Sequence, residues 1–245
     1  MKVIHWDCLI EMDKLIEQWI KVDSIIADIP YWTTACKRDT IIPFDEMRPR
    51  LNKLIKPNGA IVLFWSEPFS SALRMSNIKN YKYDWVWDKL RWSWFNYARF
   101  QPMRQHELIS VFYNKAPYYN SQWEKLEKPT TYKMAWTPSN SSHMTHSDKN
   151  RVTTVTHKKK TSILKFKKVN QNSQHPTQKP VALMEYLIKT YTNEWETVLD
   201  FTAGSGSTGI AALNTGRECI LIEKEEKYIK IINERLDQTF TSLLD

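Results

Sequence analysis

Two short segments of the sequence carry residues whose side chains could do chemistry together. The first is Asp28-Ile29-Pro30-Tyr31, which directly follows an apolar run at residues 24–27. A carboxylate and a proline carbonyl can each accept one N–H of an exocyclic amine, and a tyrosine ring can stack on the flat base that carries this amine. The segment therefore suits the binding of a nucleobase amine. The alternative for so short a match is an ordinary turn at the end of a strand.

The second segment, residues 198–223, combines a glycine-rich turn with a terminal acid. Residues 198–199 predict a short buried strand, and glycines follow at 204, 206 and 209. Residues 219–222 predict a second strand, with Glu223 at its carboxyl end. Bare backbone lets a ligand come close, a helix N-terminus offers free N–H groups, and the acid can bind two ribose hydroxyls. The unit predicts a site for a nucleoside-bearing cofactor. The alternative is a turn whose glycines only permit tight packing.

The spacing Gly204-x-Gly206-x-x-Gly209 also matches the dinucleotide fingerprint, so a nicotinamide-dependent oxidoreductase is a competing interpretation. A dinucleotide domain needs several more strand–helix units after this fingerprint. Here one further helix, at about residues 225–236, precedes the last residue, Asp245, so we expect the other strands to lie upstream. This placement disfavours the oxidoreductase.

The elements that must position the two segments alternate between strands and helices. The sequence predicts helices at 9–20, 44–54, 68–75, 180–191 and 225–236, and one that starts at residues 210–213 and ends at Gly216. Apolar runs predict seven strands, at 3–6, 24–27, 60–64, 84–87, 109–113, 198–199 and 219–222. A turn is expected at residues 57–59. The alternation predicts an α/β fold with a doubly wound, mostly parallel sheet of seven strands, which binds ligands at the carboxyl ends of its strands.

Composition narrows the class of protein. The chain has 245 residues, of which 42% are hydrophobic, enough for one large α/β domain and an insert. The formal net charge of +8, from 35 basic and 27 acidic residues, favours a polyanionic partner such as nucleic acid, with a generally basic surface as the alternative. Three scattered cysteines predict neither a disulfide framework nor a zinc cluster. We see no signal peptide and no membrane span, and we expect a cytoplasmic protein.

Residues 118–172 break the strand–helix pattern. They are polar, and no acid occurs between Lys149 and Lys168, where basic residues accumulate. We interpret residues 1–117 and 173–245 as one catalytic domain and residues 118–172 as an insert. The insert either contacts phosphates or is a solvated basic loop.

The order of these segments resembles the S-adenosylmethionine-dependent DNA amino-methyltransferases of the permuted, or β, class. In that family an Asp-Pro-Pro-Tyr motif comes first, a target-recognition segment follows, and an Asp-Pro-Phe-x-Gly-Ser-Gly motif comes last. Asp28-Ile29-Pro30-Tyr31 is similar to the first motif, with isoleucine in place of the first proline. Residues 200–206 are similar to the last, with Phe201-Thr202-Ala203 in place of Pro-Phe-x, and residues 175–180 resemble the segment before the first cofactor helix. The resemblance covers about residues 3–113 and 174–237.

This resemblance implies methyl transfer from S-adenosylmethionine to the exocyclic amine of a base that is flipped out of double-stranded DNA. Catalysis would rest on positioning by Asp28, Pro30 and Tyr31, with no metal. N6 of adenine is the expected acceptor, because relatives acting on N4 of cytosine tend to carry serine at the position of Asp28. N4 of cytosine, an RNA substrate and a non-catalytic nucleic-acid-binding subunit stay open as alternatives.

The resemblance also implies which residues bind the cofactor, S-adenosylmethionine. Asp7 resembles the position that reaches the adenine of this cofactor, and Glu223 the acid on its ribose. The expected cofactor-binding residues are Asp7, Asp28, Thr177, Lys179, Asp200, Thr202, Gly204, Gly206, Ser207, Thr208 and Glu223.

Aromatic and basic residues interleave over residues 85–104, where we expect Trp85 and Trp87 in the core and residues 92–100 as a wall of the base pocket. The loop at residues 33–43 is expected to close over the flipped base. The expected DNA-contacting residues are Lys37, Arg38, Arg91, Arg99, Arg104, Lys158, Lys159, Lys160, Lys165, Lys167 and Lys168.

Further partners follow from the resemblance alone. Members of such a family often form homodimers and accompany a cognate restriction enzyme, so we expect a restriction-modification setting. The low glycine content, with many Lys, Ile and Asn residues, suggests an AT-rich genome such as that of a phage.

Overall fold

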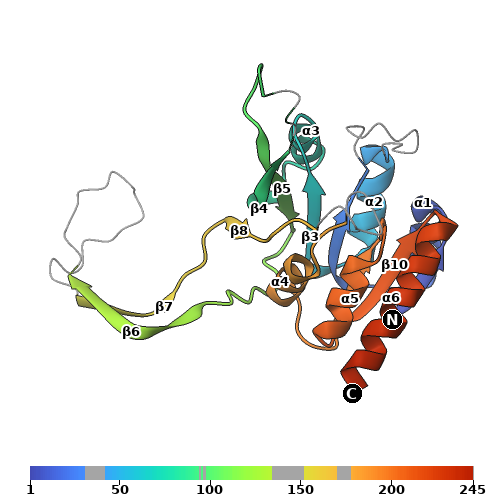
Figure 1. Ribbon diagram of the computed structural model, residues 1–245. Helices are drawn as coiled ribbons and strands as arrows, with labels where there is room; N and C mark the ends of the chain where they lie inside the picture. The colour runs from blue at the N-terminus through green and yellow to red at the C-terminus, as the bar shows by residue number, and fades with distance from the viewer. Residues whose placement is uncertain (31–41, 94, 96–97, 134–151, 170–177, 245) are drawn as a thin grey trace. The chain divides into compact units, whose positions relative to one another are not determined.

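The computed structural model describes residues 1–30, 42–93, 95, 98–133, 152–169 and 178–244. They divide into two compact units (Figure 1). The larger unit comprises Met1–Asn120 with Ser162–Asp245, and the smaller comprises Ser121–Thr161. Strand β8, which falls within the predicted insert, belongs to the larger unit.

An eight-stranded sheet forms the centre of the larger unit, in the order β1-β10-β9-β2-β3-β5-β4-β8. The first five strands in this order are parallel, and β5 runs antiparallel to both of its neighbours, β3 and β4. The strands are β1 (Lys2–His5), β2 (Val22–Asp28), β3 (Ile55–Trp65), β4 (Tyr81–Ser93), β5 (Arg104–Phe112), β8 (Ile163–Lys165), β9 (Thr197–Asp200) and β10 (Glu218–Glu223). The doubly wound, mostly parallel sheet is confirmed.

The sheet has one strand more than the seven predicted. β8 pairs in parallel with the edge strand β4 and buries Leu164. A three-residue strand is too short to produce a periodic pattern, so it could not be predicted from the sequence.

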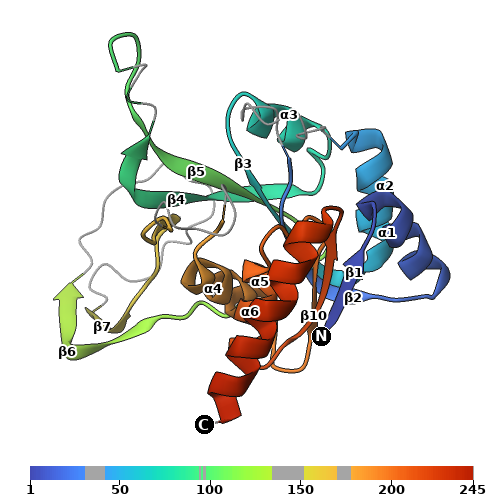
Figure 2. The same cartoon turned by 45° about the vertical axis from the view of Figure 1, so that its right-hand side comes forward.

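Helices cover both faces of the sheet (Figure 2). In β3, Ile61 and Leu63 pack in the cluster on the side of α1 and α2, whereas Val62 and Phe64 pack in the cluster with α4 and α5. Burial on both faces explains why this strand is a continuous apolar run. The helices are α1 (Cys8–Glu17), α2 (Phe44–Leu54), α3 (Phe69–Met75), α4 (Val181–Tyr191), α5 (Ser207–Asn214) and α6 (Glu226–Leu244).

The turn predicted at residues 57–59 is wrong, because these residues lie within β3. The register between β2 and β3 shifts there, from Val22 opposite Ile55 to Ser24 opposite Ala60. A Cβ atom on Gly59 would lie 2.6 Å from the carbonyl oxygen of Asp23. Glycine is therefore required for close approach of two strands rather than for a reversal of the chain.

The smaller unit is a two-stranded antiparallel sheet of β6 (Glu124–Lys133) and β7 (Val152–Lys158). None of the side chains described in this unit is buried. Its contacts lie at the surface: the Lys160 ammonium pairs with Glu124, and the Lys159 ammonium lies 5.4 Å from the centre of the Trp123 ring.

In neither unit is any described helix long and apolar enough to cross a membrane.

Candidate active site at the carboxyl edge of the sheet

Four acids follow one another along the carboxyl edge of the parallel strands. Glu223, Asp200 and Asp28 are the last residues of β10, β9 and β2, and Asp7 follows β1. Because β1, β10, β9 and β2 are consecutive in the sheet, these acids lie at a single edge. The structure thus brings together residues that are up to 216 positions apart, from Asp7 to Glu223.

The glycine-rich turn holds Glu223 in a fixed orientation. One carboxylate oxygen, Oε2, accepts the Gly204 N–H at 2.8 Å, and Oε1 accepts the Glu225 N–H at 2.9 Å. Burial raises the pKa of Glu223, and these N–H groups oppose the rise. Gly206 is the N-cap of α5 with a φ of 78°, and a Cβ there would lie 2.9 Å from Ile232 Cγ1. Position 206 therefore requires glycine for both conformation and space.

Asp200 is a buried acid whose hydrogen-bond donors are neutral. Oδ1 accepts the Thr202 N–H at 3.1 Å, and Oδ2 accepts the Thr208 hydroxyl. Burial, together with the nearby charges of Asp28 and Glu223, raises the pKa of Asp200 to about 7, although the two hydrogen bonds oppose the rise. Ser207 and Thr208, which open α5, are also buried. The acids and hydroxyl groups in this part of the edge suit a ligand that carries positive charge or hydroxyl groups.

Thr202 connects the glycine-rich turn to the strand that ends in Asp28. Its hydroxyl donates to the Asp28 carbonyl at 3.1 Å, while its N–H donates to Asp200. Phe201, beside it, is 1% exposed and belongs to the core cluster with Leu199. A hydrogen bond therefore joins the glycine-rich segment directly to the segment that begins at Asp28.

Asp28 ends β2 with its carboxylate in an ion pair. Its Oδ2 atom lies 2.7 Å from Lys179 Nζ, in the segment before α4. Ile29 is buried against Met12 and Met47, which explains an apolar residue other than proline at this position. Pro30 follows at the same edge and is partly exposed.

Lys179 lies in a buried group of charges that sequence reasoning missed. Its ammonium also lies 3.2 Å from Glu107 Oε2, and Glu107 Oε1 lies 3.3 Å from Lys89 Nζ. Burial alone would raise the pKa of Glu107, but the two lysines outweigh it and hold this pKa below its usual value. The sequence did contain a signal for their burial. Lys89 is two positions after the buried Trp87, and Glu107 is two positions before the buried Ile109. Residues two apart in a strand share a face, so both charged residues lie on the buried face.

A family model described as DNA methylase, of the N6/N4 methyltransferase type, matches residues 22–234. The chain belongs to this DNA methylase family.

Individual relatives match over shorter stretches. The type II methyltransferase M.BglI of Bacillus subtilis is 42% identical over 74 residues, which are 30% of this chain and 21% of that protein. The DNA adenine methyltransferase YhdJ of Escherichia coli (strain K12) is 44% identical over 69 residues, 28% of this chain and 24% of that protein. The matches thus span less than a quarter of either relative. A crystal structure of M1.HpyAVI in complex with SAM is 28% identical, with a TM-score of 0.65, and the match covers 96% of this chain and 99% of that one.

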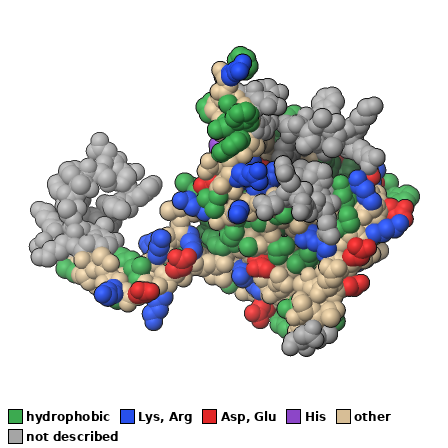
Figure 3. Space-filling view, in the orientation of Figure 1, with side chains coloured by type: hydrophobic (Ala, Val, Ile, Leu, Met, Phe, Trp, Pro, Cys, Tyr) green, Lys and Arg blue, Asp and Glu red, His purple; other side chains and the backbone are tan. Residues whose placement is uncertain are grey.

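The β4–β5 hairpin separates core aromatics from exposed ones. Trp85 and Trp87 are buried, as predicted, and Trp92, Phe95 and Phe100 are exposed. β4 is antiparallel to β5, which is antiparallel to β3, so the carboxyl end of β4 faces the same edge as Asp28. Figure 3 shows Lys or Arg and hydrophobic side chains together at the outer end of this hairpin.

The predicted DNA-contacting residues fall into three groups. In the larger unit Arg91, Arg99, Lys165 and Lys167 are exposed, Lys168 is partly buried, and Arg104 donates to Ser66 Oγ at 2.8 Å. Lys158, Lys159 and Lys160 lie in the smaller unit. Lys37 and Arg38 lie outside the described residues, as does most of the loop at residues 33–43. The same is true of Tyr31, predicted for catalysis, and Thr177, predicted for cofactor binding.

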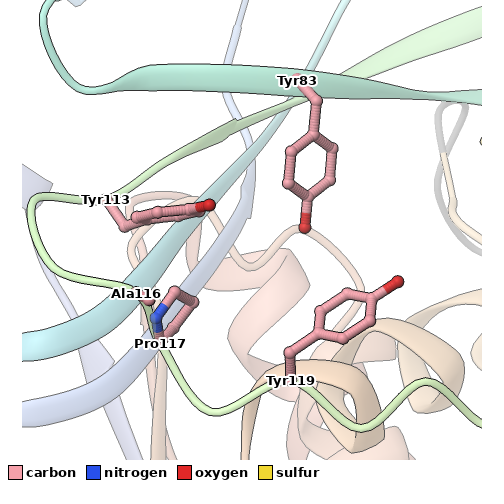
Figure 4. A pocket seen from close by; sticks show the side chains of 5 residues that line it. All are labelled: Tyr83, Tyr113, Ala116, Pro117 and Tyr119. Carbon is pink, nitrogen blue, oxygen red and sulfur yellow. The ribbon is translucent and has the colours of Figure 1, made fainter. Parts of the chain in front are cut away.

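A tyrosine-lined pocket of about 290 Å³ lies away from this edge (Figure 4). Rings of Tyr83, Tyr113 and Tyr119 surround it, together with Ala116 and Pro117. Tyr83 is near the start of β4, at the opposite end of that strand from the hairpin tip. Burial raises the pKa of Tyr83 to about 12, and the pocket contains none of the predicted site residues.

Proposed function

We propose that the protein transfers a methyl group from S-adenosylmethionine to an exocyclic amine of DNA, at N6 of adenine. The observation that carries this proposal is the bond from Thr202 to the Asp28 carbonyl, which joins a cofactor-type glycine turn to an amine-accepting carboxylate. Membership of the DNA methylase family supports it.

The residues around the glycine turn fit S-adenosylmethionine. Each Glu223 carboxylate oxygen accepts one backbone N–H and can accept a second donor, so the pair suits two ribose hydroxyls. The hydrogen bonds to Asp200 and Glu223 described above come from neutral donors, so a bound cation would stabilise their ionised forms, which favours a cationic cofactor. When bound, S-adenosylmethionine would supply an electrophilic methyl group on a positively charged sulfur; its transfer would leave a neutral thioether, and the acceptor amine would release one proton. Asp7, whose Oδ1 accepts the Leu9 N–H at 3.0 Å, is in place to contribute at the next strand.

Asp28 and Pro30 would orient the acceptor amine. In a free base the nitrogen lone pair is delocalised into the ring, so the amine is a weak nucleophile. Hydrogen bonds from its two N–H groups to the Asp28 carboxylate and the Pro30 carbonyl favour a pyramidal nitrogen whose lone pair points at the methyl group. Tyr31 would stack on the base, which must leave the duplex to reach this edge.

Adenine is the preferred base because an aspartate occupies the first position of the Asp28-Ile29-Pro30-Tyr31 segment. The relative YhdJ is named a DNA adenine methyltransferase, which supports the same choice. Methylation at N4 of cytosine is the second candidate and uses the same positioning chemistry.

Double-stranded DNA is the proposed partner. The net charge of +8 and the exposed Arg91 and Arg99 beside exposed aromatics fit phosphate and base contacts near the edge. A target-recognition role for the segment that includes the smaller unit, a homodimer and a cognate restriction enzyme are part of the same proposal.

The test is to incubate the protein with unmethylated DNA of mixed sequence and S-adenosylmethionine labelled on the methyl group, then to digest the DNA to nucleosides for mass analysis. We expect labelled N6-methyldeoxyadenosine. Labelled N4-methyldeoxycytidine would keep the mechanism and change the base. Absence of both products with intact binding of S-adenosylmethionine would favour a binding subunit, and absence of that binding would favour a nicotinamide-type ligand.

A further inference from the structure

Four charged side chains form a continuous buried chain from Asp28 to β4. Asp28 Oδ2 lies 2.7 Å from Lys179 Nζ, Lys179 Nζ lies 3.2 Å from Glu107 Oε2, and Glu107 Oε1 lies 3.3 Å from Lys89 Nζ. Their side chains are 19%, 7%, 14% and 5% exposed, in the order Asp28, Lys179, Glu107 and Lys89. The chain therefore runs from the partly open edge into the core.

The surroundings of Lys179 hold its ammonium in one place. It lies 5.1 Å from the centre of the Phe64 ring and 5.8 Å from that of Trp87, with the two rings in an edge-to-face arrangement. Aromatic faces attract a cation but cannot neutralise it. Its charge is neutralised by the two carboxylates, Asp28 and Glu107.

The arrangement balances charge, with two lysines and two carboxylates. Burying an ion pair is costly, and removing one partner leaves an uncompensated charge in a medium of low dielectric constant. Three of the four residues come from β2, β4 and β5, and Lys179 comes from the segment that leads into α4. This row of four charged residues thus fixes Asp28 relative to β4 and β5, the strands of the aromatic hairpin.

We propose that Lys179, anchored by Glu107, is a positioning residue that keeps the Asp28 carboxylate ionised and oriented for the acceptor amine, rather than a ligand of the cofactor. This inference rests on the proposed function. A charged carboxylate is the better acceptor for two reasons: it attracts the amine N–H more strongly, and it offers no proton of its own. The ion pair at Oδ2 fixes the plane of the carboxylate.

Charged groups on several elements lie near Asp28. Lys179 faces it from the segment before α4, Asp200 interacts with it from β9, and Glu107 and Lys89 act through Lys179 from β5 and β4. Glu223 lies beyond Asp200 on β10. Lys179 is in direct contact with the Asp28 carboxylate, so its removal should make Asp28 easier to protonate.

The first experiment compares Lys179→Met with wild-type protein in single-turnover methyl transfer to DNA at saturating S-adenosylmethionine, as a function of pH. We expect the rate to fall about 10²-fold at pH 7.5. The acid limb of the profile should move to higher pH by about one to three units, the effect of removing a cation next to a carboxylate. Lys179→Arg, which keeps the charge, should restore the position of the acid limb.

Two further variants separate positioning from stability. Glu107→Gln removes the anchor but leaves the Lys179 charge beside Asp28, so it should slow transfer without moving the acid limb to higher pH. Arg48→Met removes a buried cation on the other face of the sheet, where Arg48 donates to the Leu73 carbonyl at 2.9 Å. It should lower the melting temperature and leave the acid limb in place.

A second readout does not depend on catalysis. The Asp28 carboxyl group can be titrated by carbon-13 NMR in the ligand-free protein, where Lys179→Met should shift its titration to higher pH. If wild-type protein transfers no methyl group, the proposed function fails, and this titration still decides the inference. Two results would reduce Lys179 to a structural role. The first is an Asp28 titration in Lys179→Met that superposes on that of wild type. The second is an acid limb that does not move in Lys179→Met while its melting temperature falls as in Arg48→Met. A rise in the dissociation constant of S-adenosylmethionine with an unchanged saturating rate would assign Lys179 to the cofactor.

Discussion

Two pairs of buried acids lie at the same edge of one sheet, and their electrostatics are opposite. On β9 and β10, Asp200 and Glu223 are held by backbone N–H groups and a threonine hydroxyl, and burial raises the pKa of each. On β2 and β5, Asp28 and Glu107 share the Lys179 ammonium, and the pKa of Glu107 is lowered despite burial.

Under the proposed function, this difference would separate two tasks at this edge of the sheet. In the β9–β10 half, the acids have raised pKa values, and binding of a cationic cofactor would favour their ionised forms. The β2–β5 half is already neutralised by lysines, so its carboxylate can stay charged next to a neutral amine. The comparison predicts that substitutions in the two halves affect different measured quantities.

The largest effect should come from Asp28→Ala. Loss of the carboxylate that accepts the amine N–H should reduce the saturating rate of methyl transfer by at least about 10³-fold, because this bond orients the nucleophile in the transition state. The measurement is single-turnover transfer of labelled methyl to DNA. A rate within threefold of wild type would remove Asp28 from the proposed mechanism.

Asp200→Asn should change how stability depends on pH. Burial raises the pKa of Asp200 to about 7. Between about pH 4 and pH 7 the native state therefore keeps a proton on Asp200 that the unfolded state has already lost. The wild-type free energy of unfolding should therefore fall as pH rises through this window, by up to about 1.4 kcal/mol per pH unit. Urea unfolding of ligand-free protein at pH 5, 6 and 7 should show a flatter dependence in Asp200→Asn. Equal slopes in the two proteins would contradict the raised pKa.

The smallest effect should come from Arg91→Ala at the hairpin. Removal of one phosphate contact should weaken DNA binding severalfold and reduce the slope of log K against log salt concentration by about one. Fluorescence anisotropy with a DNA duplex at several salt concentrations measures both. Lys227→Ala, an exposed lysine on α6, is the matched control and should leave the slope unchanged. An Arg91→Ala slope equal to that of the control would exclude a phosphate contact at this position.

The sequence was sufficient to predict those parts of the site that depend on short segments. The glycine turn and the acids at strand ends are local patterns, and strand order then brings them to one edge. The Lys179–Glu107 pair links residues 72 positions apart through a tertiary contact that no local pattern encodes. Likewise β8 was missed because three residues give no period, and α6 reaches Leu244 rather than residue 236 because its C-terminal turns lack a clear stop signal.

The most direct test of the two-part edge is the dissociation constant of S-adenosylmethionine, measured by calorimetry for wild type, Glu223→Gln and Asp28→Ala in one series. Glu223→Gln should weaken binding by about 1–3 kcal/mol, the cost of losing a charged hydrogen-bonding partner. Asp28→Ala, whose charge is already neutralised by Lys179, should bind within about threefold of wild type, well under the roughly 1.4 kcal/mol of a tenfold change. Equal weakening in both variants, or weakening in Asp28→Ala alone, would contradict the division of the edge into a cofactor half and an amine half.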